Sequence, residues 1–260
     1  LGIIEDCRGN LSPRIRLSAA IASALLAGFL LKAVLPIPGI STGGLVVLGW
    51  LFTCFCVAGV TQAFNIIDGL NGLASGVAVI VLFGLGWIAH GLGDLLLLQL
   101  SVGTIVAILG FMLVNFPFGR IFLGDGGSYL FGGLISMNVI NTSKLNPEIS
   151  PFFFCVVLFY LFYEVFFSFC RKAFKKKSPV KPDSNHLHML IFDKLQSLNI
   201  KNPNALTGLV INLVYLLLIL PIYFNFNSAH ENALFSRYWF FILLVIYTLV
   251  YAKLYKSKKK

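Results

Sequence analysis

Long apolar stretches alternate with short polar linkers along the whole chain. A helix needs roughly 20 mostly apolar residues to cross the hydrocarbon core of a bilayer. The pattern therefore predicts an all-α fold, a polytopic transmembrane helix bundle of about eight spans that forms one integral-membrane domain over residues 1–260. The predicted spans are residues 17–36, 43–63, 73–90, 94–114, 128–142, 151–170, 204–225 and 235–254.

The composition supports this membrane class. Of the 260 residues, 58% are hydrophobic and only 12% are charged, and the mean hydropathy is +0.87. A soluble domain would carry about 25% charged residues. The five cysteines are scattered and lie mostly in apolar runs, which is typical of small core residues rather than of a disulfide or a metal site.

The net charge of +10 follows from where lysine and arginine lie. Eight spans place both ends of the chain on one side of the membrane. That side, with the span ends that touch it, carries 17 of the 20 basic residues, so it is predicted to be cytoplasmic. The basic excess thus reflects topology and not a nucleic-acid partner, and the KSKKK tail suits an anionic lipid surface. The cytoplasmic segments are residues 1–16, 64–72, 115–127, 171–203 and 255–260.

Residues 115–129, NFPFGRIFLGDGGSY, place Asp125 in a glycine-rich turn at the edge of a predicted span. A charge at such an edge is costly and is often functional. Mg²⁺ prefers oxygen ligands and is commonly held by one or two carboxylates together with substrate phosphates. The turn therefore suits a metal ion on a phosphate, with Arg120 as a bidentate phosphate partner. The alternative is an ordinary glycine-rich turn that carries one stray acid.

Two further clusters lie on the same side. Glu5 and Asp6 are adjacent carboxylates, which repel each other unless a cation, a proton or an arginine is near; a solvated loop is the alternative. Asn65, Asp68 and Asn71 recur at intervals of three, so at a helical end they would share a face that can hydrogen-bond a nucleobase or a sugar. A tight turn is the alternative here, because DG and NG are turn signals.

The long linker 171–203 is polar and basic, and we expect it to form a cytoplasmic histidine loop. Its segment SPVKPDSNHLHML places His186 and His188 two positions apart. They are a weak zinc pair, because no cysteine lies near. After a basic stretch stiffened by Pro179 and Pro182, they form a cationic or hydrogen-donating loop that suits a diphosphate. Ordinary surface histidines are the alternative.

Each cluster alone favours its structural alternative, since short motifs often mislead. Four polar clusters on one membrane face together indicate a site for a charged, metal-bound substrate. One more acid, Glu164, falls inside the sixth predicted span among phenylalanines and tyrosines. Pairing with a neighbouring helix is its preferred interpretation.

The same segments resemble known motifs. FLGDGGSYLFG resembles the GDxGS signature of the polyprenyl-phosphate N-acetylhexosamine-1-phosphate transferases, which form glycosyltransferase family 4. NIIDGLNGLA resembles the N-x-x-D-G-x-D-G segment of that family. SPVKPDSNHLHM resembles the histidine loop of its undecaprenyl-phosphate GlcNAc-1-phosphate transferase branch, and IIEDCRGNLSPRIRL resembles that branch's Asp-Asp segment. Phospho-MurNAc-pentapeptide translocase is a more distant member. The resemblance runs from Gly2 to about Leu195, with the motifs in the same order.

This resemblance implies transfer of an N-acetylhexosamine 1-phosphate from a UDP-sugar to undecaprenyl phosphate, with release of UMP, to start a cell-surface glycan such as O-antigen or teichoic acid. Mg²⁺ would be required as the cofactor, with Mn²⁺ as an alternative. Membrane lipids would surround the site. The resemblance leaves open whether the protein forms a homodimer. Asp125 would ligate the metal, and Asp6 with Glu5 would deprotonate or orient the lipid phosphate. His186 and His188 would hold the phosphates of the nucleotide sugar. The nucleotide pocket would be lined by Asn65, Asp68, Asn71, Asn115 and Phe122.

The chain departs from the family pattern at three positions. Glu5 stands where the pattern has its first aspartate, Asn71 where many members have aspartate, and Met189 where an HxHH pattern has its last histidine.

The chain begins at Leu1 in a polar segment without a signal peptide, so we expect that spans which precede the Asp-Asp segment in the family are missing. Direct attack by the lipid phosphate is preferred over a covalent aspartyl route, which needs two displacements. The alternative functions are a lipid or solute transporter and an inactive truncated homologue.

Overall fold

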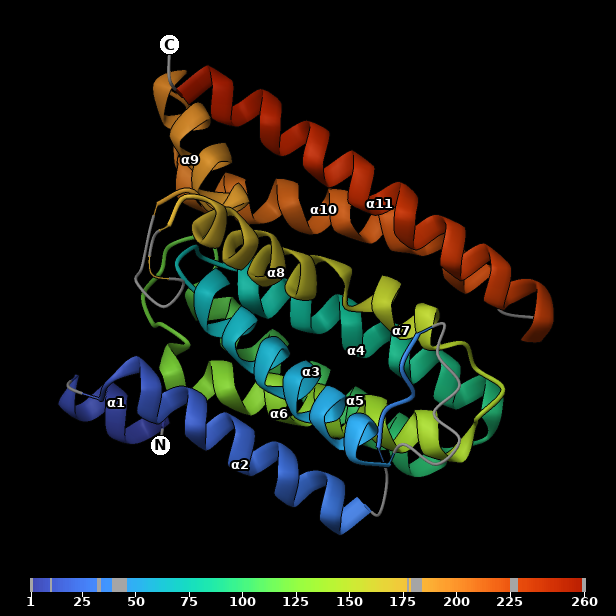
Figure 1. The fold of residues 1–260 in the computed structure, drawn as a ribbon. Coiled ribbons are helices and arrows are strands. Elements are labelled where there is room, and N and C mark those ends of the chain that lie inside the picture. Colours follow the sequence, from blue (N-terminus) through green and yellow to red (C-terminus); the bar gives the residue numbers. More distant parts are fainter. Residues whose placement is uncertain are drawn as a thin grey trace.

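The computed structural model describes residues 2–9, 11–31, 34–38, 46–176, 178, 184–224 and 229–258. Every regular element among these residues is a helix (Figure 1). The helices are α1 (Gly2–Arg8), α2 (Pro13–Leu31), α3 (Val46–Ile67), α4 (Leu73–Leu92), α5 (Leu95–Asn115), α6 (Gly124–Leu145), α7 (Pro151–Val157), α8 (Phe159–Phe174), α9 (Leu187–Ser197), α10 (Pro203–Phe224) and α11 (Ala229–Lys258).

A helix lies at each predicted span: α2 to α6, the pair α7 and α8, α10, and α11. The prediction of an all-α membrane protein is confirmed for the described residues. By length and composition, α3, α4, α5, α10 and α11 can cross a membrane. The pair α7 and α8, bent by 83°, adds a sixth span if the two helices cross as one. The count of eight spans therefore stays a prediction.

The core is built around α4, which is largely buried between Leu73 and Ala89. It packs against α5 and α10, while α3 packs against α2, α6 and α8. Glycine allows the closest of these contacts. A Cβ on Gly132 of α6 would lie 2.5 Å from the backbone of Thr61 in α3. Small residues commonly permit such close approach between membrane helices.

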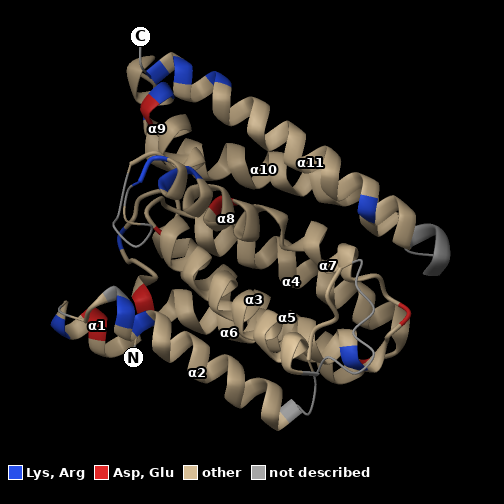
Figure 2. Cartoon of the chain, viewed as in Figure 1, with Lys and Arg blue, Asp and Glu red and all other residues tan. Residues whose placement is uncertain are grey.

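The first described helix, α1, and the last turns of α11 lie at the same end of the bundle (Figure 1). Charged residues gather there, around α1, α9 and the end of α11, and few lie along the middle of the helices (Figure 2). Such a distribution is typical of a bundle whose middle faces hydrocarbon. This end of the bundle is called the charged end below.

Candidate active site at the start of helix α6

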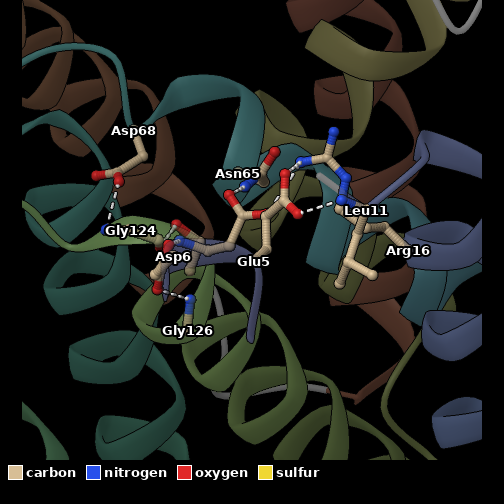
Figure 3. Close-up of polar contacts among 10 residues, drawn as sticks. Glu5, Asp6, Leu11, Arg16, Asn65, Asp68, Gly124 and Gly126 are labelled. Carbon is tan, nitrogen blue, oxygen red and sulfur yellow. Dashed lines mark hydrogen bonds and ion pairs between the residues drawn. The ribbon is translucent and has the colours of Figure 1, made fainter. Parts of the chain in front are cut away.

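The first turn of α6 is held by carboxylates from two other segments (Figure 3). The N–H groups of Asp125 and Gly126 donate to the two carboxylate oxygens of Asp6, at 2.8 and 2.9 Å. The N–H of Gly124 donates to Asp68 Oδ2 at 3.1 Å. The first N–H groups of a helix have no partner within it, and their partial positive charge favours anions. Asp6 of α1 and Asp68 after α3 therefore cap α6 from outside the helix.

Two glycines allow this approach. Gly124 has a φ of 68°, in the left-handed region that favours glycine. A Cβ at this position would lie 2.8 Å from the carboxylate of Asp6. A Cβ on Gly2 of α1 would lie 2.6 Å from the backbone of Asp125 and Gly126. The glycine-rich turn thus lets α1 lie directly against the start of α6.

The side chain of Asp125 has two hydrogen-bond donors beside it. It accepts from Asn65 Nδ2 at 2.5 Å and from Arg16 Nη1 at 2.9 Å. Helix α2 begins at Pro13, earlier than the predicted span, because proline suits the first helical position, and Arg16 therefore lies in the first turn. The same guanidinium lies 3.9 Å from Glu5 Oε1. One arginine thus bridges two of the predicted site carboxylates.

The site carries more negative than positive charge. Burial, and then the carboxylates of Asp125 and Asp6, raise the pKa of Asp68 to about 7, although its backbone hydrogen bond acts in the opposite direction. Such crowding favours uptake of a proton or a metal cation. The residues that meet here are called the Asp125 cluster. They are Glu5, Asp6, Arg16, Asn65, Asp68 and Asp125.

Asn71 contacts the loop before α6 rather than the residues of the Asp125 cluster. Because α3 ends at Ile67, Asn71 falls in the turn that follows the helix. The prediction that it shares a helical face with Asn65 and Asp68 is therefore wrong. Its Nδ2 instead donates to the carbonyl of Pro117 at 3.1 Å, which ties the α3–α4 turn to the loop before α6.

Asn115 is buried and uses both of its polar atoms on the backbone. Its Oδ1 accepts from the N–H of Gly72 at 2.8 Å, and its Nδ2 donates to the carbonyl of Ile121 at 2.8 Å. Asn115 thereby joins the loop before α6 to the α3–α4 turn. Arg120 and Phe122 are exposed on this loop, Phe122 at 75%. Contacts of these residues with a nucleotide stay predictions.

His186 and His188 form a separate cluster with Glu164. Both rings are buried, at 7% and 2% exposure, and stack with centroids 5.5 Å apart. Burial lowers the pKa of His188 to about 4, although the Glu164 carboxylate acts to raise it. His188 is therefore neutral near pH 7, which agrees with the hydrogen-donating alternative for this residue and not with the cationic one. Both rings are buried, so the alternative of ordinary surface histidines is wrong. Pro179 and Pro182, expected to stiffen this loop, lie outside the described residues.

Arg16 is a site residue that the sequence did not assign. It is 109 positions from Asp125, and it resembles the other basic residues that set the topology. The one sequence feature that points to Arg16 is its place in the segment that resembles the Asp-Asp motif.

The prediction that Glu164 pairs with a neighbouring helix is confirmed, because its carboxylate accepts from the Tyr247 hydroxyl of α11 at 2.5 Å.

A cavity of about 410 Å³ adjoins the Asp125 cluster, between α2, α3 and α6. Arg16 lines one end of it, and Ala27 and Ile140 line it farther along the helices. The stretch of α2 from Arg16 to Ala27 is about 16 Å long at 1.5 Å per residue. Most of the wall is small or apolar, as at Ala20 and Gly133. The charged cluster therefore borders apolar space inside the bundle.

The part of the chain that the structure describes holds no group of three or more histidine, cysteine, aspartate or glutamate side chains arranged as a metal cage. Mg²⁺ does not need one, because it usually keeps several waters and binds one or two carboxylates and substrate phosphates. The oxygens of Asp125 and Asp68 fit that mode. A divalent cation would also relieve the repulsion among these carboxylates, which after burial helps to raise the pKa of Asp68.

The sequence profile described as glycosyl transferase family 4 matches residues 1–143. The chain belongs to this family. The match covers α1 to nearly the end of α6 and includes every residue of the Asp125 cluster. The family assignment made from the GDGGS and neighbouring motifs is thus confirmed. The histidine loop and α11 lie beyond the matched residues.

This glycosyl transferase family 4 chain is also similar to individual curated proteins. A probable undecaprenyl-phosphate N-acetylglucosaminyl 1-phosphate transferase of Bacillus subtilis (strain 168) is 34% identical over 147 residues, 54% of this chain and 40% of the relative. An undecaprenyl-phosphate alpha-N-acetylglucosaminyl 1-phosphate transferase of Thermotoga maritima is 31% identical over 195 residues, 75% and 58% of the two chains. A phospho-N-acetylmuramoyl-pentapeptide-transferase of Clostridium perfringens (strain 13 / Type A) is 45% identical over 87 residues, 33% and 27%. The chain spans about half the length of the curated relatives it matches.

Proposed function

We propose that this chain transfers an N-acetylhexosamine 1-phosphate from a UDP-sugar to undecaprenyl phosphate, releasing UMP and leaving a lipid diphosphate sugar. The observation that carries the proposal is the Asp125 cluster, in which carboxylates from three segments meet at a helix N-terminus beside an apolar cavity. The names of the relatives support the same reaction class. We place the reaction at the cytoplasmic face of the bacterial inner membrane, at the start of a cell-surface glycan.

Charge is the central problem of this reaction, because both substrates are phosphates that repel each other. We assign Asp125 and Asp68 to hold Mg²⁺, with Mn²⁺ as an alternative. When bound, the ion would neutralise the diphosphate and the charge that develops on UMP. Asn65 would orient Asp125, to which its amide already donates. Arg16 would exchange its carboxylate partner for a phosphate, which it can bind through two N–H groups.

The transfer itself needs one displacement. An oxygen of the lipid phosphate attacks the β-phosphorus of the UDP-sugar, and the bond from that phosphorus to the oxygen of UMP breaks. The second pKa of a phosphate monoester is about 6, so above pH 7 the attacking group is mostly a dianion and needs no general base. Asp6 is already committed to two backbone donors of α6. We therefore assign Asp6 and Glu5 to orienting the site rather than to proton transfer.

The two substrates would reach the site from different directions. The nucleotide sugar would approach from solvent, where Arg120 and Phe122 are exposed on the loop before α6. The isoprenoid would lie along the cavity between α2 and α6, with its phosphate near Arg16. His188 is neutral near pH 7, so it would offer a hydrogen bond rather than a charge to a phosphate.

The test is a panel of UDP-sugars offered to membranes that contain the protein, with UMP release as the readout. We expect release with a UDP-N-acetylhexosamine only when undecaprenyl phosphate and a divalent cation are both added. Membranes without the protein, and reactions without the lipid phosphate, are the controls. No release with any UDP-sugar, or release that does not depend on the lipid phosphate, would contradict the proposal.

A further inference from the structure

Glu164 lies inside α8 with 1% exposure, and its carboxylate is surrounded by donors from other segments. Oε1 accepts from His186 Nδ1 and from the N–H of Leu187, both at 2.9 Å. Oε2 accepts from the hydroxyl of Tyr247 at 2.5 Å. A buried carboxylate is tolerated only with such partners, because burial otherwise disfavours the charged form. Three donors thus converge on one acid outside the Asp125 cluster.

One of these contacts determines where α9 begins. Leu187 is the first residue of α9, and His186 before it makes no capping hydrogen bond with its own side chain. The first N–H groups of a helix need an outside acceptor. Glu164 supplies it from a position 23 residues earlier in the chain. The carboxylate also suits the partial positive charge of a helix N-terminus.

A second contact determines the protonation pattern of a ring. A carboxylate only accepts hydrogen bonds, so the hydrogen between Glu164 and His186 belongs to Nδ1. In the neutral ring, the lone pair then lies on Nε2. Partners of this kind are what fix the tautomer and the orientation of functional histidines. Without the acceptor, the ring loses the contact that favours hydrogen on Nδ1.

Helix α11 also makes hydrogen bonds to the backbone of the histidine loop. Besides Tyr247, Tyr251 donates from its hydroxyl to the carbonyl of Asn185 at 3.0 Å, and Lys258 Nζ donates to the carbonyl of Ser184 at 3.2 Å. Tyr247 and Tyr251 are four residues apart, so one face of α11 meets the loop. The end of α11 lies beside α9 at the charged end (Figure 1).

We propose that Glu164 is the positioning residue of the histidine loop. It holds His186 in the Nδ1–H tautomer and starts α9, and Tyr247 holds its carboxylate in place. Glu164 acts on a substrate only through the loop. The effect on turnover rests on the proposed transferase function, whereas the effect on the tautomer does not.

Nitrogen-15 NMR of the purified chain tests the tautomer directly. The chain has four histidines, so ¹⁵N-histidine labelling gives few signals, and His186→Asn identifies the one from His186. We expect the Nδ1–H form in the wild type and its loss in Glu164→Leu, which has similar volume but no acceptor. Tyr238→Phe, at a position of α11 that is 65% exposed, is the matched control and should keep the wild-type signal. A folded Glu164→Leu protein that keeps the Nδ1–H signal would overturn the proposal.

Tyr247→Phe keeps the carboxylate and serves as the second variant if Glu164→Leu does not fold. Loss of one buried hydrogen bond should speed hydrogen exchange of the amides in residues 184–190 about tenfold. The KM for the UDP-sugar should rise by about the same factor while kcat changes little, because the loop acts in binding. Exchange and KM equal to those of Tyr238→Phe would overturn the proposal. A wild type that releases no UMP would contradict the transferase function alone, since the tautomer and exchange results stand without it.

Discussion

Helices α6 and α9 each begin on a carboxylate from elsewhere in the chain, but the two carboxylates have opposite surroundings. At the start of α6, Asp6 lies among other acids, and the crowding helps to raise the pKa of Asp68 to about 7. At the start of α9, Glu164 is fully buried and faces three donors. One cluster therefore carries several crowded negative charges, and the other holds a single carboxylate whose two oxygens both accept hydrogen bonds.

This difference in charge indicates that the two clusters have different roles. Surplus charge lowers the stability of the folded protein, and it becomes favourable only when a cation or a proton arrives. A buried carboxylate with hydrogen-bond donors on both oxygens contributes to the stability of its own surroundings, and removing it leaves those donors unpaired. We therefore expect changes in the Asp125 cluster to act mainly on activity, and changes at Glu164 to act mainly on stability and on the histidine loop.

The largest expected effect is that of Asp125→Asn on turnover. The variant keeps the shape of the side chain and loses the charge assigned to the metal, so kcat should fall about 10²- to 10³-fold. UMP release measures this, and electron paramagnetic resonance of Mn²⁺ should show weaker binding of the ion. Asp94→Asn is the matched control, because Asp94 only caps α5 through the N–H of Leu97. Unchanged turnover and Mn²⁺ binding in Asp125→Asn would remove the metal role from this cluster.

The second effect is on the free energy of unfolding. It compares the two carboxylates that cap a helix from elsewhere in the chain, Glu164 at α9 and Asp6 at α6. Glu164→Ala leaves three buried donors without their acceptor and should cost about 3–5 kcal/mol, as for other broken buried pairs. Asp6→Ala removes a cap near the surface and should cost only about 1 kcal/mol. Thermal midpoints in detergent would show a much larger fall for Glu164→Ala. Equal falls would show that both carboxylates serve structure alike, and the assignment of different roles would be wrong.

The sequence was sufficient for what depends on local pattern. Helices lie at the predicted spans because bilayer thickness dictates the length of an apolar run. Asp125 could be singled out because a lone acid in a glycine-rich turn between apolar runs is unusual. The pairing of Glu164 with a neighbouring helix could also be predicted, since a buried acid in a span needs a partner.

What the sequence did not reveal depends on how the helices pack. Arg16 reaches Asp125 only because α2 starts early and lies along α6. The interval of three between Asp68 and Asn71 suggested one face, but the helix ends before them and turn geometry replaces helical geometry. His188 is buried because α9 packs against α10 and α11, and no local pattern encodes that packing.

The third effect is a pH-dependent gain in stability from Asp68→Asn. The pKa of Asp68 is about 7 in the folded protein, against an ordinary value of 3.8. The folded state therefore binds this proton more tightly than the unfolded state, and stability from this group is lost as the pH rises from 4 through 7. The slope is at most about 1.4 kcal/mol per pH unit. Asp68→Asn removes the titration.

The thermal midpoint of Asp68→Asn, measured without divalent cations, should exceed that of the wild type most at pH 8. The difference should shrink as the pH falls toward 4, where the carboxyl is protonated in the folded state and partly protonated in the unfolded state. Addition of Mg²⁺ at pH 8 should narrow the difference by stabilising the wild type. A difference that is constant between pH 5 and pH 8 would show that crowding of carboxylates is not what distinguishes this cluster.

The smallest effect is expected at the exposed end of α11. Lys258 pairs with Asp193 at 2.8 Å, but the two side chains are 34% and 35% exposed. Such pairs contribute only about 0.2–1 kcal/mol and weaken in salt. Lys258→Gln should therefore lower the thermal midpoint slightly, and the part of the difference that comes from the ion pair should vanish in about 1 M salt, where charges are screened within about 3 Å. Tyr247→Phe, at the buried contact, should cost more and be insensitive to salt. If Lys258→Gln costs as much as Tyr247→Phe, the loop is held from its surface, and the buried Glu164 is not its main support.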